Sequence, residues 1–355
     1  MQVNNVVKNK KYTYFIGIDI SKNELDYAII DDKKLLFHKE CKNEPGAILA
    51  FVKELKSLPR FTIAKAIFCM EDAGVYGNHL FNSLGKLKAN IVVENAYHLK
   101  HSFGMTRGKD DKIDSIRIAQ YAQKNRDELK VWVRRRPILQ QLVNLFVIRN
   151  RLLELSSVLI NPLKEQNAFV KKELQLQSVQ LCKRSADAVK SDLTDINSTI
   201  DKLIDSDENL KKLKTLITSV PNVGPITAMC IIICTGEFKE IKDPKKFACY
   251  AGIAPFKNES GKMMRKSKTS HIANKKMKAL LHSCAITALR WDKELKAYYE
   301  RKTLKEGKAK MAVINAIRNK LVLRIFACVN QERCFSRNYV NSKSAKTIEA
   351  LPDEI

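Results

Sequence analysis

Four acidic residues in the first third of the chain are placed so that they could share a metal ion. Asp19 lies inside the apolar run FIGIDI, where an unpaired carboxylate is costly to bury. Glu71 directly follows the apolar run TIAKAIFCM. Asp111 and Asp114, in GKDDKIDSIRIA, are three residues apart and would share a helix face. Asp110 is a rival, since it lies four residues from Asp114.

Carboxylates gathered in this way predict a bound divalent cation. They repel one another unless cations hold them, and oxygen-only ligands suit Mg²⁺ or Mn²⁺. Two such ions can activate the attacking oxygen and stabilise the leaving oxygen in phosphodiester cleavage. The alternative is a set of unrelated surface acids. We interpret Asp19, Glu71, Asp111 and Asp114 as metal ligands and catalytic residues because their predicted elements can bring them together within a very basic chain.

The elements that must position these residues follow from the hydropathy pattern. Strands are predicted at 13–20, 24–30, 33–40, 62–70 and 89–94, and helices at 44–57, 76–85 and 110–123. Short polar linkers make the first three strands antiparallel neighbours. The order of elements predicts a mixed α/β sheet of the ribonuclease-H-like (RuvC-like) fold. Neighbouring first and fourth strands would bring Asp19 and Glu71 to one edge, and Gly17 would let a backbone or a ligand approach.

The middle of the chain shows heptad spacing. Apolar residues recur at intervals of three and four over 145–159 and 186–203, with Pro162 predicted to interrupt the first helix. This pattern predicts a coiled-coil spacer, either a helical hairpin within one chain or a dimerising arm.

The C-terminal part is predicted to be mainly α-helical. The turn PNVGP between two apolar helical runs is typical of a helix-hairpin-helix, which offers backbone N–H groups to a phosphate. Two more helices are predicted at 279–301 and 308–329. The predicted domains are a catalytic domain at 12–128, the spacer at 138–208, a helical domain at 213–333 and a polar tail at 334–355.

Charge indicates the partner. The chain has 64 Lys and Arg against 38 Asp and Glu, a formal net charge of +26, which favours a nucleic acid. The segment 257–278, predicted as a loop, carries eight basic residues and one acid. The predicted nucleic-acid contacts are Lys109, Lys112, Gly224, Lys257, Lys262, Arg265, Lys266, Lys268, Lys275 and Lys276.

Other classes of protein fit less well. No apolar stretch is long enough to span a membrane. Nine scattered cysteines, an odd number, indicate a reducing cytoplasm without disulfides, and no Cys/His cluster has zinc spacing. FIGIDI also resembles the phosphate-binding strand of sugar kinases, but the charge of +26 argues against a small-molecule kinase.

The acidic set, with GKDDKIDSIRIA as its most telling stretch, resembles the DEDD transposases of the insertion-sequence one-ten family, to which the Piv/MooV invertases are related. VPNVGPITA, FACYAGIAP, ESGK and NKKMKALL resemble the C-terminal domain of that family in order and spacing. The likeness covers roughly 14–329. The family pattern selects Asp111 rather than Asp110, because Asp111 comes two residues after Lys109.

The resemblance implies a site-specific DNA recombinase of a mobile element, working in the cytoplasm at the nucleoid with Mg²⁺ or Mn²⁺. It also implies a structured bridge RNA that pairs with donor and target DNA, and a nucleophilic serine that maps to Ser260. Ser267 and Ser270 are the fallbacks. We expect a dimer or tetramer organised through the spacer. Two other functions stay open: a metal-dependent junction nuclease that uses water, and a nucleic-acid-binding protein without chemistry.

Overall fold

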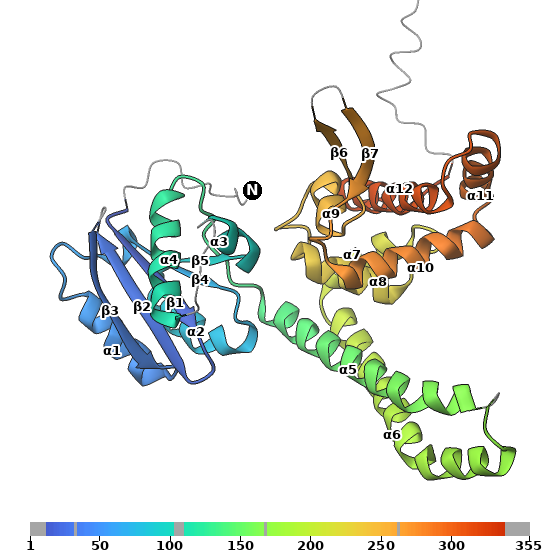
Figure 1. The fold of residues 1–355 in the computed structure, drawn as a ribbon, viewed down its shortest axis with the longest axis horizontal. Helices are drawn as coiled ribbons and strands as arrows, with labels where there is room; N and C mark the ends of the chain where they lie inside the picture. The colour runs from blue at the N-terminus through green and yellow to red at the C-terminus, as the bar shows by residue number, and fades with distance from the viewer. Residues whose placement is uncertain (1–11, 32–33, 103–109, 167–168, 261–262, 338–355) are drawn as a thin grey trace, which may run out of the picture. The chain divides into compact units, whose positions relative to one another are not determined.

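The computed structural model describes residues 12–31, 34–102, 110–166, 169–260 and 263–337. The chain divides into two compact units, Met1–Arg134 and Arg135–Ile355 (Figure 1). The N-terminal unit is built on a sheet, and the C-terminal unit on helices that share one continuous apolar core.

A five-stranded mixed sheet forms the centre of the N-terminal unit. Its order is β3-β2-β1-β4-β5. The strands are β1 (Tyr14–Ile20), β2 (Glu24–Asp31), β3 (Lys34–Lys42), β4 (Ala66–Glu71) and β5 (Asn90–Glu94). The first three strands are antiparallel, and β4 and β5 run parallel to β1. The predicted mixed sheet, with the first and fourth strands as neighbours, is confirmed. The fourth strand is shorter than predicted, because residues 63–65 form a 3₁₀ turn before it.

Helices cover both faces of this sheet. The helices are α1 (Pro45–Leu55), α2 (Asn78–Lys86), α3 (Ala96–Ser102) and α4 (Asp111–Lys124), and a second 3₁₀ turn spans Gly74–Gly77. Residues of α1 and α2 pack against Ile16 and Phe68 on one face. On the other face, α3 and α4 pack against Phe15 and Cys69. Figure 1 shows α4 lying over the strands. The short helix α3 has no counterpart among the predicted elements.

Two long helices open the C-terminal unit. They are α5 (Pro137–Glu165) and α6 (Lys172–Asp205), and they run antiparallel, since Arg149 donates to Asn197 at 2.8 Å while Gln175 donates to the Leu163 carbonyl at 3.5 Å. The predicted interruption at Pro162 is wrong. The helix continues to Glu165, because a proline one turn before the end removes only one backbone hydrogen bond from the ladder.

Shorter helices complete the C-terminal unit. They are α7 (Glu208–Thr218), α8 (Pro225–Thr235), α9 (Pro244–Tyr250), α10 (Lys275–Trp291), α11 (Lys293–Glu300) and α12 (Lys310–Asn330), with a π-helical turn at Arg301–Lys305. The helix predicted at 279–301 is divided in two. Asp292 ends α10 and caps α11, where its carboxylate accepts hydrogen bonds from the backbone N–H groups of Glu294 and Leu295.

The basic segment predicted as a loop contains a β-hairpin. β6 (Pro255–Ser260) and β7 (Met263–Thr269) form a two-stranded antiparallel ribbon (Figure 1). Charged and polar residues dominate its sequence, so no alternation of buried and exposed positions indicates strands. The prediction of a loop for this stretch is therefore corrected to a hairpin followed by a short connection to α10.

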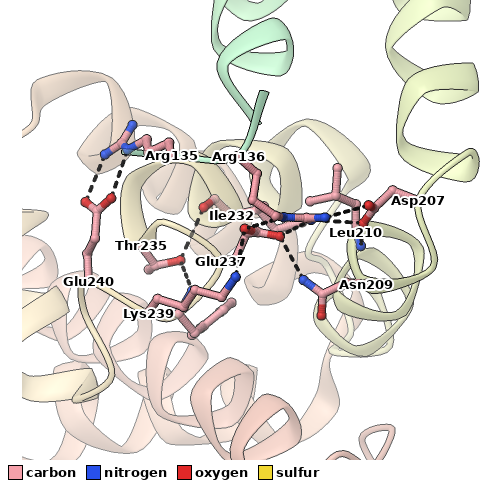
Figure 2. A network of polar contacts seen from close by, with 11 residues as sticks. Arg135, Arg136, Asp207, Asn209, Leu210, Ile232, Thr235, Glu237, Lys239 and Glu240 are labelled. Atoms are coloured by element: carbon pink, nitrogen blue, oxygen red, sulfur yellow. Dashed lines mark hydrogen bonds and ion pairs between the residues drawn. The ribbon is translucent and has the colours of Figure 1, made fainter. Parts of the chain in front are cut away.

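A network of ion pairs and hydrogen bonds connects the start of α5 to other helices of its unit (Figure 2). Arg136 donates to both carboxylate oxygens of Asp207, at 2.7 and 3.0 Å, and also pairs with Glu237. The Glu237 side chain is only 2% exposed and accepts a further hydrogen bond from Asn209. The hydrogen bonds from Arg136 lower the pKa of Asp207 to about 2. This network fixes the first turn of the spacer onto α7 and the end of α8.

Among the described helices, none combines the length and the apolar character that a membrane span requires. All nine cysteines are free thiols. Of the predicted polar tail, residues 338–355 lie outside the described part of the chain.

Candidate metal centre and serine hairpin

Asp19 stands near the end of β1 on the face that α4 covers. The side chains of Phe15 and Asp19 point to this face, because they are separated by an even number of residues along the strand. Gly17 lies between them. A Cβ atom at Gly17 would come within 2.2 Å of the backbone of Ser115 and Ala119 in α4. The absence of a side chain at Gly17 therefore lets the backbone of α4 contact the backbone of β1. The close approach predicted at Gly17 is thus made by a helix of the protein.

The first turn of α4 brings two more carboxylates to Asp19. Asp110 caps the helix, since its carboxylate accepts a hydrogen bond from the Lys112 backbone N–H at 3.0 Å. Asp111 and Asp114 belong to the first turn that follows this cap. Carboxylate oxygens of Asp19, Asp111 and Asp114 all lie within 4.8 Å of one another. The structure thus separates the two rival positions: Asp110 caps the helix, and Asp111 joins the cluster.

The three carboxylates of the cluster repel one another. Burial raises the pKa of Asp19 to about 6, with further contributions from the charges of Asp111 and Asp114. Arg117 partly offsets this charge, since its guanidinium donates to Asp114 at 2.9 Å. Three carboxylates that share one small volume form a hard, oxygen-only donor set, which fits a divalent ion such as Mg²⁺ or Mn²⁺.

Glu71 lies beside this cluster. Ile18 and Met70 form the last register pair of the parallel strands β1 and β4, so Asp19 and Glu71 are the next residues on these two adjacent strands. Glu71 is not one of the three residues whose oxygens lie within 4.8 Å of one another. The four acids of the sequence prediction are therefore arranged as three in a cluster and one on the neighbouring strand end.

Ser260 is the last residue of β6 and pairs in register with Met263 of β7. The predicted contact Lys262 lies outside the described part of the chain. The structure describes the backbone, but not the side chains, at Lys257, Ser260, Arg265 and Lys266.

The other predicted nucleic-acid contacts are scattered over both units. Lys112 is exposed on the first turn of α4, and Lys109 lies outside the described residues. Lys268, Lys275 and Lys276 are exposed at the end of β7 and the start of α10. Lys276 comes within 3.9 Å of Glu154 in α5.

Gly224 is the N-cap of α8 and makes no side-chain cap, and Pro225 follows it. The turn between α7 and α8 joins two helices as predicted, and the helix-hairpin-helix function of this turn stays a prediction.

Comparison with known families assigns the chain. The family profile of IS110-type DEDD transposases, described as a transposase, matches residues 16–166, and the profile described as the transposase IS116/IS110/IS902 family matches residues 214–300. Together they cover about two thirds of the chain. The chain belongs to the IS110 family of transposases. It is an enzyme that cleaves and transfers DNA strands, and the resemblance inferred from its sequence is confirmed.

Two distant relatives of this transposase align over nearly its whole length. The pilin gene-inverting protein of Moraxella lacunata is 22% identical, over 91% of this chain and 98% of the relative. Its namesake from Moraxella bovis is 21% identical, also over 91% of this chain and 98% of the relative. A 43.6 kDa protein of insertion element IS110 from Streptomyces coelicolor is 24% identical over 31% of this chain and 27% of its own length.

The sequence interpretation missed three polar residues of the transposase's acidic face. Arg117 contacts Asp114 from the next turn of α4, a spacing of three that is visible in the sequence. Asp26 faces Asp19 across β1 and β2, and it is bonded to His38 of β3. These two residues gave no signal, because their meeting depends on the register of three strands.

Proposed function

We propose that this transposase is a site-specific DNA recombinase that combines a divalent metal centre with a serine nucleophile. Asp19, Asp111 and Asp114 would hold the metal ion, with Glu71 on the adjacent strand as the fourth acid. The grouping of three carboxylates within 4.8 Å of one another is the observation that carries the proposal. When bound, Mg²⁺ or Mn²⁺ supplies positive charge that polarises the scissile phosphate and stabilises the oxygens that gain charge.

The protein's own residues have separate tasks in the proposed reaction. The carboxylates of β1 and α4 would hold the cation that offsets their repulsion of the phosphodiester. The Ser260 hydroxyl attacks the phosphorus, loses its proton and forms a serine–phosphate ester, while the bond to one deoxyribose oxygen breaks and that oxygen is protonated. The ester keeps the bond energy, so a deoxyribose hydroxyl of another strand can displace the serine and restore a phosphodiester. Lys257, Lys262, Arg265, Lys266 and Lys268 along the hairpin would neutralise the phosphate backbone.

The proposed partners are donor and target DNA and a structured bridge RNA, met in the cytoplasm at the nucleoid. The Moraxella relatives are named for gene inversion, which is a cut-and-rejoin reaction on DNA and agrees with this chemistry. The charge of +26 suits partners with many phosphates.

The proposed oligomer uses the α5–α6 pair. The heptad residues 186, 189, 193, 196, 200 and 203 of α6 are buried or half-buried, but Ile148 and Leu155 of the α5 heptads stay exposed. These two side chains would join an interface with another copy.

The direct test is capture of the covalent intermediate. Purified protein with its co-purifying RNA is incubated with labelled donor DNA and Mg²⁺, then denatured and separated by gel electrophoresis. We expect a protein–DNA adduct for the wild type and for Ser270→Ala, and none for Ser260→Ala or Asp19→Asn. Ser267→Ala is a second control in the same hairpin.

Two results would favour the alternative functions. Cleaved DNA without an adduct, persisting in Ser260→Ala, indicates a metal-dependent nuclease that uses water. DNA effects that survive Asp19→Asn indicate a binding protein without chemistry. Sequencing the RNA that co-purifies with the protein tests the guide: a single structured species is expected, and a random mixture would contradict it. DNA affinity should also fall steeply with rising salt, because Lys and Arg contacts to phosphate release counterions.

A further inference from the structure

Asp26 is a second carboxylate on the sheet next to the proposed metal centre. It pairs in register with Asp19 across the antiparallel strands β1 and β2. Residues directly opposite each other in such a pair project to the same face, with Cβ atoms about 4.5–5.5 Å apart. Asp26 therefore lies on the α4 face with Asp19, and it is 8% exposed. A charge in this position needs an explanation, since like charges facing each other destabilise a sheet.

His38 holds the Asp26 carboxylate in place. The ring Nε2 lies 2.9 Å from Asp26 Oδ1, and both side chains are 12% exposed. His38 is the register partner of Ala28 on β3, which places it diagonally beside Asp26. A carboxylate accepts hydrogen bonds, so Nε2 carries the proton and donates it. This contact satisfies one oxygen of Asp26 and restricts its rotamer.

The two register partners of Asp26 lie in different surroundings. On β3 its register partner is Glu40, which is exposed to solvent. On β1 its partner is Asp19, which is half-buried and receives two further carboxylates from α4. Water screens the charge of Glu40, but the buried Asp26 acts on Asp19 through a medium that screens less.

We infer that Asp26, held by His38, is a positioning residue of the metal centre, whose charge strengthens the binding of a divalent ion to Asp19, Asp111 and Asp114. The inference rests on the proposed metal site. Asp26 is outside the group of three clustered carboxylates and acts through Asp19. It adds negative potential at the sheet side of the cluster. Its repulsion with the other carboxylates is present with and without the ion, so its attraction for a cation of charge +2 adds to the affinity. His38 keeps this carboxylate buried and correctly turned.

The test is a titration of the full chain with Mn²⁺, following the loss of the free-ion signal by electron paramagnetic resonance at constant pH. Asp26→Asn removes the charge but keeps an oxygen that can accept from His38. We expect it to weaken Mn²⁺ binding about tenfold, the range seen when outer partners of metal ligands are removed. Glu40→Gln is the matched control, because it removes a charge from the other side of Asp26, and its affinity should stay within about twofold of wild type.

His38 variants separate positioning from a purely structural role. His38→Leu removes the donor and should weaken Mn²⁺ binding, whereas His38→Gln keeps a donor and should restore most of the affinity. A urea titration of each variant reports folding independently, and this pair of variants decides the question if Asp26→Asn does not fold.

Two results would overturn the inference in distinguishable ways. If Asp26→Asn binds Mn²⁺ as wild type while Asp19→Asn does not bind it, the role of Asp26 is limited to its contact with His38 between β2 and β3. If Asp19→Asn also binds as wild type, no ion sits at this cluster, and the proposed metal site fails together with the inference.

Discussion

Replacing Gly17 by alanine should disturb the acidic cluster without touching any carboxylate. The new Cβ would lie 2.2 Å from Ala119 N and Ser115 O, and 2.8 Å from the Cα of Ala119. All three are backbone atoms of α4, so no side chain can rotate away. Because ordinary contact begins near 3.4 Å, α4 must retreat from β1 by roughly 1 Å.

The expected cost is about 3 kcal/mol of the free energy of unfolding of the N-terminal unit, at the upper end for overpacking because rigid backbone is displaced. The same shift carries Asp111 and Asp114 away from Asp19. We expect Mn²⁺ affinity to fall at least tenfold and DNA cleavage about a hundredfold, as is usual when reacting groups are misplaced by 1 Å.

Tryptophan fluorescence gives a local readout of this effect. The chain has two tryptophans, and Trp132 stacks on Phe81 in the N-terminal unit, with ring centroids 4.9 Å apart. A Trp291→Phe background therefore leaves a single reporter for urea unfolding of that unit. Gly85→Ala is the control, because a Cβ there meets nothing within 4 Å and alanine favours the helix α2 by about 0.5–1 kcal/mol. Wild-type stability and Mn²⁺ affinity in Gly17→Ala would refute the close packing of α4 on β1.

Three further outcomes follow from the charges. The folded-state pKa of Asp19, about 6, is raised above its ordinary 3.8, so the native state binds a proton more tightly than the unfolded state. The stability of the metal-free protein should therefore fall as pH rises from about 4 to 6. Asp19→Asn should remove this slope in urea titrations and gain about 1–2 kcal/mol at pH 8, allowing for solvent screening, and an unchanged slope would contradict the raised pKa. Arg117→Gln should tighten Mn²⁺ binding about threefold, because the guanidinium competes for Asp114, and weaker binding would show instead that Arg117 orients the carboxylate. Arg136→Ala should cost about 2–3 kcal/mol in calorimetry, because buried Glu237 loses its guanidinium partner but keeps Lys239 at 3.3 Å as a cation, whereas Arg135→Ala, whose partner Glu240 is 47% exposed, should cost under about 1 kcal/mol; equal losses would argue against this difference.

The sequence was sufficient for the strands of the five-stranded sheet. Alternating apolar residues predicted the five strands in their order, and the spacing of Asp111 and Asp114 predicted a shared helix face. Gly17 indicated a close approach in the right place, although only the structure shows that the partner is α4. The β6–β7 hairpin was missed because its residues are polar along both strands, so the pattern that identifies a half-buried strand is absent there.

Contacts between distant segments carried no such signal. Arg136 meets Asp207 and Glu237 across separations of 71 and 101 residues. His38 reaches Asp26 only through the pairing of β2 with β3, and that register shifts at Ile29/Ile30. A pattern confined to one helix or strand cannot encode these pairings. The polar surroundings of the acidic cluster therefore became visible only in the folded chain.

The most direct measurement is the anomalous scattering of Mn²⁺ in crystals of the full chain grown or soaked with the ion. We expect an anomalous peak bonded to oxygens of Asp19 and of at least one of Asp111 and Asp114, at about 2.0–2.2 Å, and its loss in crystals of Asp19→Asn. An empty cluster at millimolar Mn²⁺, or an ion bound elsewhere in the chain, would contradict a metal centre at the junction of β1 and α4.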